Sequence, residues 1–177
     1  MTDPANLLPY VRDIADWPTP GIMFRDITPM LGDADAFARC VGALAEAGEA
    51  ATGGPIDLVA GIEARGFILA APVALELDAG FIPVRKHGKL PHSTLSEAYS
   101  LEYGEAVLEI HVDAIEPGQR VLIVDDVLAT GGTIAATAEL FRRAGGEIAG
   151  VNVLIELGAL NGRDRNPGLP ISSLLVM

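Results

Sequence analysis

Short apolar runs alternate along this chain with longer stretches of helical periodicity. The runs have the length of a strand and are apolar at all or all but one of their positions, at residues 56–60, 81–84, 121–124 and 151–155. Such runs are typical of strands in a parallel sheet that is covered on both faces. With a return strand near residues 107–110, the pattern predicts an α/β fold with a mainly parallel central sheet of about five strands flanked by helices.

The stretch from Val121 to Thr133 is the most informative part of the chain. Asp125 and Asp126 are expected where the apolar run ends, followed by the Gly- and Thr-rich segment Ala129–Thr133 and then by a helical pattern. A Gly-rich loop between a strand and a helix binds anions through backbone amides and the positive end of the helix dipole. Carboxylates would repel a phosphate alone, but they accept hydrogen bonds from a diol. The expected ligand is therefore a ribose 5-phosphate.

The alternative for this stretch is an acidic turn after a core strand, followed by an ordinary helix start. The lysine of a P-loop is missing here, and the chain contains no G-x-G-x-x-G. As a whole, the stretch resembles the phosphoribosyl pyrophosphate motif of the type I phosphoribosyltransferases.

A second strand–loop–helix unit follows residue 60, with the loop at 61–67. Arg65 in this loop could offer a forked cation to a polyphosphate, or it could be a surface residue that pairs with Glu63. The family resemblance makes this segment the pyrophosphate loop, which in the family often carries a strained peptide bond. The cationic run Arg85–Lys89 is expected to face the substrate, the alternative being a solvated face.

Residues 90–105 are polar, and we expect them to form a long loop in a hairpin arm that can fold over the site. The segment 99–104 resembles the flexible catalytic loop of the adenine-specific members of the family. This resemblance makes Glu102 the acid–base residue and places Tyr103 beside it. The alternative for Glu102 is a solvated loop glutamate.

Three prolines between residues 16 and 29 exclude a regular helix there, so an irregular segment with short extended pieces is expected. It could simply cap the core, or it could form a lid on which Phe24 or Ile22 stacks on a planar ligand. The segment resembles the base-binding segment of the adenine-specific members, which assigns the base to Met23, Phe24 and Arg25.

Composition narrows the possible partners. The 177 residues are expected to form a single domain, with an N-terminal hood at about 1–32 and a flexible catalytic loop at about 85–105. A formal net charge of −12 argues against nucleic acid and against an anionic membrane surface. The only cysteine, Cys40, lies among apolar positions and fits a reducing compartment. We found no signal peptide or membrane span, and we expect a cytoplasmic protein.

The family resemblance also implies an activity. It implies that adenine reacts with 5-phosphoribosyl 1-pyrophosphate to give AMP and pyrophosphate in purine salvage, in a homodimer, with Mg²⁺ held mainly by substrate and water. The residues that it assigns to phosphoribosyl pyrophosphate or AMP are Arg65, Arg85, Lys86, Lys89, Tyr103, Asp125, Asp126, Ala129, Thr130, Gly131, Gly132 and Thr133, of which the two aspartates are also catalytic. The alternatives are another base (hypoxanthine, xanthine or orotate) and a non-catalytic regulator that senses phosphoribosyl pyrophosphate.

Overall fold

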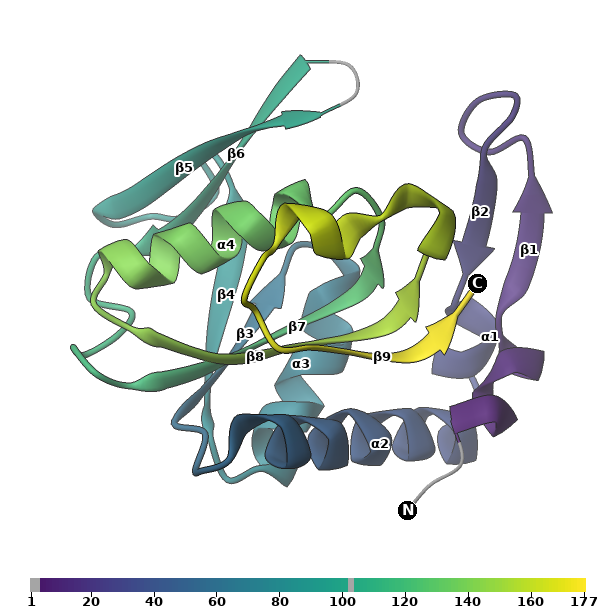
Figure 1. The fold of residues 1–177 in the computed structure, drawn as a ribbon, viewed down its shortest axis with the longest axis horizontal. Helices are drawn as coiled ribbons and strands as arrows, with labels where there is room; N and C mark the ends of the chain where they lie inside the picture. The colour runs from purple at the N-terminus through teal and green to yellow at the C-terminus, as the bar shows by residue number, and fades with distance from the viewer. Residues whose placement is uncertain (1–3, 102–103) are drawn as a thin grey trace.

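A seven-stranded sheet with the strand order β5-β6-β4-β3-β7-β8-β9 dominates the computed structural model, which describes residues 4–101 and 104–177 (Figure 1). The strands are Leu58–Ile62 (β3), Gly80–Lys86 (β4), Thr94–Leu101 (β5), Gly104–His111 (β6), Arg120–Leu128 (β7), Glu147–Glu156 (β8) and Ile171–Val176 (β9). The five strands at one side of this order, β4-β3-β7-β8-β9, are parallel to one another. The hairpin at the other side is antiparallel: β6 is antiparallel to β4, and β5 is antiparallel to β6. The mainly parallel sheet is therefore confirmed, and the hairpin extends it.

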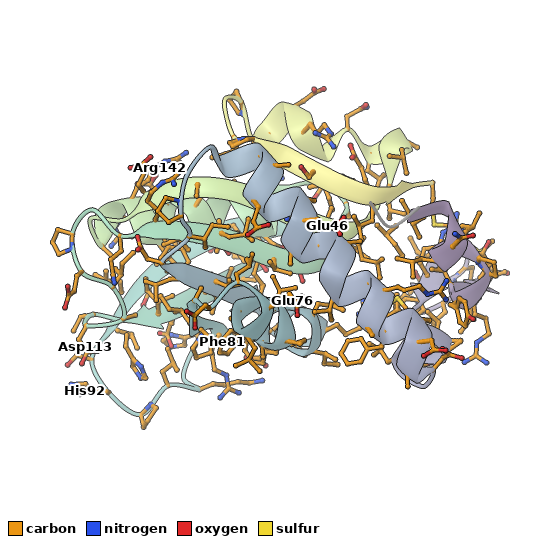
Figure 2. The ribbon with its side chains drawn as sticks, turned by 90° about the horizontal axis from the view of Figure 1, so that it is seen from below. Glu46, Glu76, Phe81, His92, Asp113 and Arg142 are labelled. Atoms are coloured by element: carbon orange, nitrogen blue, oxygen red, sulfur yellow. The ribbon has the colours of Figure 1, made fainter. Side chains whose placement is uncertain are left out.

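Helices cover both faces of the sheet. Two of them, α2 (Ala34–Thr52) and α3 (Arg65–Glu76), lie on one face, and Figure 2 shows α2 crossing it with Glu46 on its length. On the other face lies α4 (Gly132–Arg143). The shorter helical pieces are α1 (Thr28–Leu31) and the 3₁₀ turns η1 (Pro4–Tyr10), η2 (Gly158–Leu160) and η3 (Gly162–Arg165).

The central strand β7 explains why its apolar run shows no alternation. Leu122 and Val124 belong to the core under α2 and α3, whereas Val121 and Ile123 belong to the core under α4. All four side chains are fully buried. Burial of each such side chain is worth about 1.5–3 kcal/mol, so packing on both faces fixes β7 in the middle of the sheet.

Helix α2 has a defined cap at each end. Asp33 caps it, because its carboxylate accepts a 2.8 Å hydrogen bond from the Ala36 amide, and Gly53 ends it in the left-handed region at φ +61°. Cys40 is fully buried within this helix, and burial raises the pKa of its thiol to about 12. In the described part of the chain, no helix is long and apolar enough to cross a membrane.

The hood contains an antiparallel ribbon of β1 (Arg12–Ala15) and β2 (Met23–Asp26). Asp26 ties it to α1 because its carboxylate accepts hydrogen bonds from the Thr28 amide at 2.9 Å and from Arg12 Nε at 3.0 Å. These bonds, the Thr28 bond foremost, lower the pKa of Asp26 to about 2. The hood and the β5–β6 hairpin rise on the same side of the molecule from its opposite ends (Figure 1).

The prediction of a long loop over residues 90–105 was wrong in extent. Strand β5 begins at Thr94 and pairs with β6 along its whole length. Leu95 and Tyr99 pack partly against the core under α4, while Ser96 and Ala98 between them are exposed. This period of two is a strand pattern that the polar composition of the segment concealed.

The order of the parallel strands fixes where a ligand can bind. The chain leaves β3 through α3 and returns as β4 on one side of β3, while β7 lies on its other side. The loops after β3 and β7 therefore diverge at a topological switch point, where open α/β sheets bind their ligands at the carboxyl ends of the strands. They are the loops at 61–67 and 129–133.

Candidate active site

The 129–133 loop joins β7 to α4 as predicted. Helix α4 begins at Gly132, and Gly131 before it has φ +79°, in the left-handed region that favours glycine. The first amides of a helix have no acceptor within the helix, and the helix dipole places partial positive charge there. The loop and the start of α4 can thus bind an anion without a cationic side chain.

The two aspartates do not lie where the sequence predicted them. They were expected where the strand ends, but β7 continues to Leu128 and both are inside it. The strand continues because its backbone still pairs with β8, from Asp125 opposite Val153 to Leu128 opposite Glu156. Asp125 is 9% exposed and Asp126 is 6% exposed.

Burial changes the acidity of Asp125. Loss of solvation and, next, the negative charge of Asp126 raise the pKa of Asp125 well above its ordinary value. The Asp125 carboxylate accepts a 2.9 Å hydrogen bond from the Asp126 amide. A ligand that donates hydrogen bonds to these carboxylates would replace solvation that the fold removes.

Arg65 connects the 61–67 loop to strand β7 and to the hood. Its Nε donates a hydrogen bond to the Asp126 carboxylate, and its guanidinium lies 5.0 Å from the centroid of the Phe24 ring. The alternative of a surface pair with Glu63 is therefore wrong. Arg65, predicted to bind the polyphosphate, thus contacts both the residue predicted to stack on the base and a residue predicted to bind the ribose.

A pocket of about 270 Å³ opens at this meeting point. It is lined by Ile22, Met23, Phe24, Arg25, Arg65, Asp126, Val127, Ala129 and Leu157. The hood thus forms one wall and the end of β7 forms another. The lining combines an aromatic ring, aliphatic side chains, a guanidinium and a carboxylate, which suits a planar base attached to a hydroxylated sugar.

Arg25 is held on the hood by its own ion pair. It pairs with Asp13, the residue opposite it in the β1–β2 register, while its buried Nε has no partner within residues 4–101 and 104–177. Its guanidinium is therefore engaged by Asp13, and its backbone, with that of Met23, remains the part that could read a base edge.

The 61–67 loop holds a buried carboxylate that the sequence presented only as a pairing partner for Arg65. Glu63 accepts hydrogen bonds from Arg85 Nε at 3.2 Å, from the Lys86 amide at 3.1 Å and from the ammonium of Lys89. Burial alone would raise the pKa of Glu63, but these bonds outweigh it and lower the pKa to about 2. The peptide bond between Glu63 and Ala64 is cis.

Two side chains of the predicted cationic run, Arg85 and Lys89, therefore lie against the 61–67 loop. Arg85 and Lys86 are the last residues of β4, and Lys89 follows in the turn. The turn is fixed by Glu109 of β6, whose carboxylate lies 2.6 Å from His87 Nδ1 and accepts a 2.9 Å hydrogen bond from the Gly88 amide. The predicted residues Glu102 and Tyr103 lie outside the described residues.

Sequence reasoning missed the segment beneath the 129–133 loop. Asn166 donates hydrogen bonds to the carbonyl oxygens of Gly131 and Gly162, and it is 5% exposed. The only signal was the Asn166-Pro167-Gly168 turn, which read as an ordinary polar connection. Leu157, in the pocket wall, gave no signal beyond following a core strand.

Comparison with known proteins gives a consistent result. The phosphoribosyl transferase domain family matches residues 30–170. An adenine phosphoribosyltransferase from Thermobifida fusca is 56% identical over 98% of this chain and 97% of that protein. One from Streptomyces coelicolor is 56% identical over the whole of both.

Solved structures agree with these relatives. The adenine phosphoribosyltransferase of Thermoanaerobacter pseudethanolicus superposes with a TM-score of 0.94 at 50% identity, covering 98% of this chain and 99% of that one. The enzyme from Saccharomyces cerevisiae, solved with an imino-altritol bisphosphate and adenine, superposes with a TM-score of 0.93 at 36% identity, over 97% and 98%.

Proposed function

Because this chain belongs to the adenine phosphoribosyltransferases, we propose that it joins adenine to 5-phosphoribosyl 1-pyrophosphate, giving AMP and pyrophosphate in purine salvage. The observation that carries the proposal is the contact of Arg65 with both Phe24 and Asp126. This contact brings together, around one pocket, the aromatic ring proposed to stack on the base, the carboxylate proposed to bind the ribose hydroxyls and the guanidinium proposed to bind the pyrophosphate.

The phosphoribosyl group would lie along the end of β7. In this proposal, Ala129, Thr130, Gly131, Gly132 and Thr133 bind the 5′-phosphate, mainly through backbone amides, which the free start of α4 supports. Asp125 and Asp126 accept hydrogen bonds from the ribose hydroxyls and stabilise positive charge that develops on the ring as the leaving group departs.

The leaving pyrophosphate would be held by cations from two loops. Arg65 exchanges its bond to Asp126 for the pyrophosphate, and Arg85, Lys86 and Lys89 approach from the end of β4. The contacts of Glu63 with Arg85 and Lys89 support this arrangement, because they hold both cations beside the 61–67 loop before any ligand binds. Negative charge that builds up on the leaving group is then met by preorganised positive charge.

The base would lie against Phe24, with backbone groups at Met23 and Arg25 facing its polar edge. A pocket that matches the exocyclic amine of adenine leaves its own polar groups unpaired against hypoxanthine, which discriminates strongly. Glu102 would exchange a proton with the purine, with Tyr103 beside it helping to exclude water.

Magnesium belongs to the proposal as a partner of the substrate. Within residues 4–101 and 104–177, no three His, Cys, Asp or Glu side chains converge on one point. This donor set fits an ion carried mainly by phosphate oxygens and water, with Asp125 and Asp126 nearby as oxygen donors. When bound, Mg²⁺ would offset negative charge on the pyrophosphate.

A homodimer in the cytoplasm completes the proposal. Ile68 and Leu75 of α3 and Phe81 of β4 are large apolar residues that are 43%, 83% and 38% exposed. A second copy packed on this face would bury them, and it would bring the neighbouring Arg85 region close to the partner's site. The single buried cysteine, Cys40, fits a reducing compartment.

The test is to incubate the protein with phosphoribosyl pyrophosphate, Mg²⁺ and one base at a time, and to identify the nucleotide formed. AMP from adenine, with little product from hypoxanthine, xanthine or orotate, is the expected result. Comparable efficiency with another base would overturn the assignment of the base. Binding of phosphoribosyl pyrophosphate without turnover of any base would favour the sensing regulator instead.

A further inference from the structure

The turn η3 and the residues after it lie directly beneath the 129–133 loop. A Cβ atom on Gly131 would overlap the Gly162 carbonyl, and a Cβ atom on Gly162 would overlap the Ala129 carbonyl. The two backbones are therefore in direct contact. On this side of the loop, the absence of a side chain on Gly131 therefore allows close contact with Gly162.

This supporting segment is tied to the sheet and not only to the loop. The Arg163 guanidinium donates two 2.7 Å hydrogen bonds to the Glu156 carboxylate at the end of β8 and one of 3.0 Å to Ser173 in β9. The segment thus behaves as part of the rigid scaffold, and whatever it holds is held in register with the sheet.

Asn166 makes the polar connection between this segment and the loop. Its Nδ2 lies 3.0 Å from the Gly131 carbonyl oxygen and 2.9 Å from that of Gly162. Two carbonyls can only accept, so the amide nitrogen must be the atom that faces them. The orientation of the side chain follows from its partners.

The bond to Gly131 has a consequence on the other side of the same peptide. In a trans peptide, the carbonyl of Gly131 and the N–H of Gly132 point in opposite directions. Asn166 and the Ala135 amide, at 3.0 Å, together hold the Gly131 carbonyl toward the protein. The Gly132 N–H is thereby directed away from the scaffold, to the side where an anion would bind.

We propose that Asn166 is a positioning residue for the 5′-phosphate, acting through the Gly131–Gly132 peptide. This inference rests on the proposed function, since it assumes that the 129–133 loop binds the phosphate. The loop has no cationic side chain among its five residues. Its affinity for a phosphate therefore depends on how its amides point, which is the property that Asn166 controls.

Asn166→Asp is the sharpest substitution because it keeps the shape of the side chain and removes the donor. A carboxylate at this position would face two carbonyl oxygens that it can only repel. The Gly131 peptide should turn or shift, and the added negative charge would lie close to the bound phosphate. Asn166→Ala removes the same donor without adding charge and serves as the milder variant.

The chain offers a matched control in Asn152 of β8. It too is buried, its Nδ2 donates a 2.7 Å hydrogen bond to the backbone carbonyl of Leu44, and its Oδ1, like that of Asn166, has no partner in the described part of the chain. Leu44 lies in α2, away from the 129–133 loop. Asn152→Asp therefore reproduces the chemical change without touching the loop.

The experiment measures binding by calorimetry, with Mg²⁺ present, for AMP, ribose 5-phosphate and inorganic pyrophosphate. Asn166→Asp should weaken AMP and ribose 5-phosphate by about 10- to 100-fold and change pyrophosphate by less than about 2-fold. Asn166→Ala should weaken binding of the same two ligands, AMP and ribose 5-phosphate, by a smaller factor. Asn152→Asp should leave the ratio of AMP to pyrophosphate affinity unchanged, even if its melting temperature falls.

The ratio of affinities keeps the test valid if a variant is partly unfolded, because loss of folded protein reduces binding of every ligand equally. Equal losses for all three ligands, or unchanged AMP affinity in Asn166→Asp, would overturn this inference. If the wild-type protein binds neither AMP nor ribose 5-phosphate, the proposed function itself fails.

Discussion

Replacing Glu63 with glutamine should show how much the 61–67 loop depends on the negative charge of this side chain. Glu63 lies in the 61–67 loop, 8% of its side chain is exposed, and it holds Arg85 and Lys89. Glutamine keeps the size and one acceptor oxygen but loses the negative charge. The two cations should then be held less firmly, and the loop should be less stable.

The pKa of Glu63 gives the size of the effect. A lowering from 4.5 to about 2 corresponds to at most about 3.5 kcal/mol of stability, at roughly 1.4 kcal/mol per pH unit. The partners are partly solvated, since 33% of the Arg85 side chain and 47% of the Lys89 side chain are exposed. Solvent screening reduces the expected loss to about 1–2 kcal/mol, or roughly 2–8 °C in Tm.

The pH dependence has a definite sign. Because the pKa of Glu63 is lower in the folded protein than in the unfolded chain, its contribution is complete above pH 4.5 and is lost as the pH falls toward 2. The free energies of unfolding of wild type and Glu63→Gln, measured in urea between pH 7 and pH 3, should therefore become more similar as the pH falls. The KM for phosphoribosyl pyrophosphate should rise more than kcat falls.

A suitable control is Glu97→Gln, which breaks the more exposed pair between Glu97 and Arg143. That pair should contribute under about 1 kcal/mol to the free energy of unfolding, and its loss should not change the KM for phosphoribosyl pyrophosphate. A difference between wild type and Glu63→Gln that stays constant from pH 7 to pH 3, or that equals the Glu97→Gln effect, would refute the reasoning.

Three further substitutions test the site. Asp125→Asn should lower turnover strongly yet raise Tm at pH 7, because burial raises the pKa of this carboxyl and makes its charged form costly in the folded protein. The gain in stability should shrink as the pH falls toward 3.8, and a lower Tm of the variant at pH 7 would contradict this prediction. Arg65→Ala should uncover Phe24, so that adenine alone binds more tightly in calorimetry while the KM for phosphoribosyl pyrophosphate rises; unchanged adenine affinity would argue against the contact. Glu102→Gln should reduce kcat by about 10²–10⁴-fold with little change in phosphoribosyl pyrophosphate affinity, and normal turnover across the pH range would assign the proton to water.

Features encoded within a few residues could be predicted from the sequence. The apolar run at 121–124 identified a strand buried on both faces, and the Gly-Gly of the 129–133 loop identified the start of α4. Asp33 and Gly53, which cap and end α2, are residue types that favour those positions in any helix. In each case the signal and the structure that it specifies are adjacent in the chain.

Features that depend on distant pairing could not be predicted in this way. The charges of Asp125 and Asp126 suggested the end of a strand, but the backbone of β7 pairs with β8 whatever its side chains are. Similarly, the alternation of residues 94–99 was hidden by polar side chains, because α4 covers only part of β5. The roles of Glu63 and Asn166 follow from partners that are 22 to 35 positions away.

The bond between Asn166 and Gly131 also bears on how the protein is made. These residues are 35 positions apart, so a ribosome completes the 129–133 loop and α4 before it adds the residue that supports them. During that interval the loop has its sequence but lacks its scaffold, and β8 has no β9 beside it. Synthesis proceeds from the N-terminus at about 5–20 residues per second, so the interval lasts a few seconds. A nascent chain should therefore acquire affinity for ribose 5-phosphate late and abruptly, after residue 166 has left the exit tunnel.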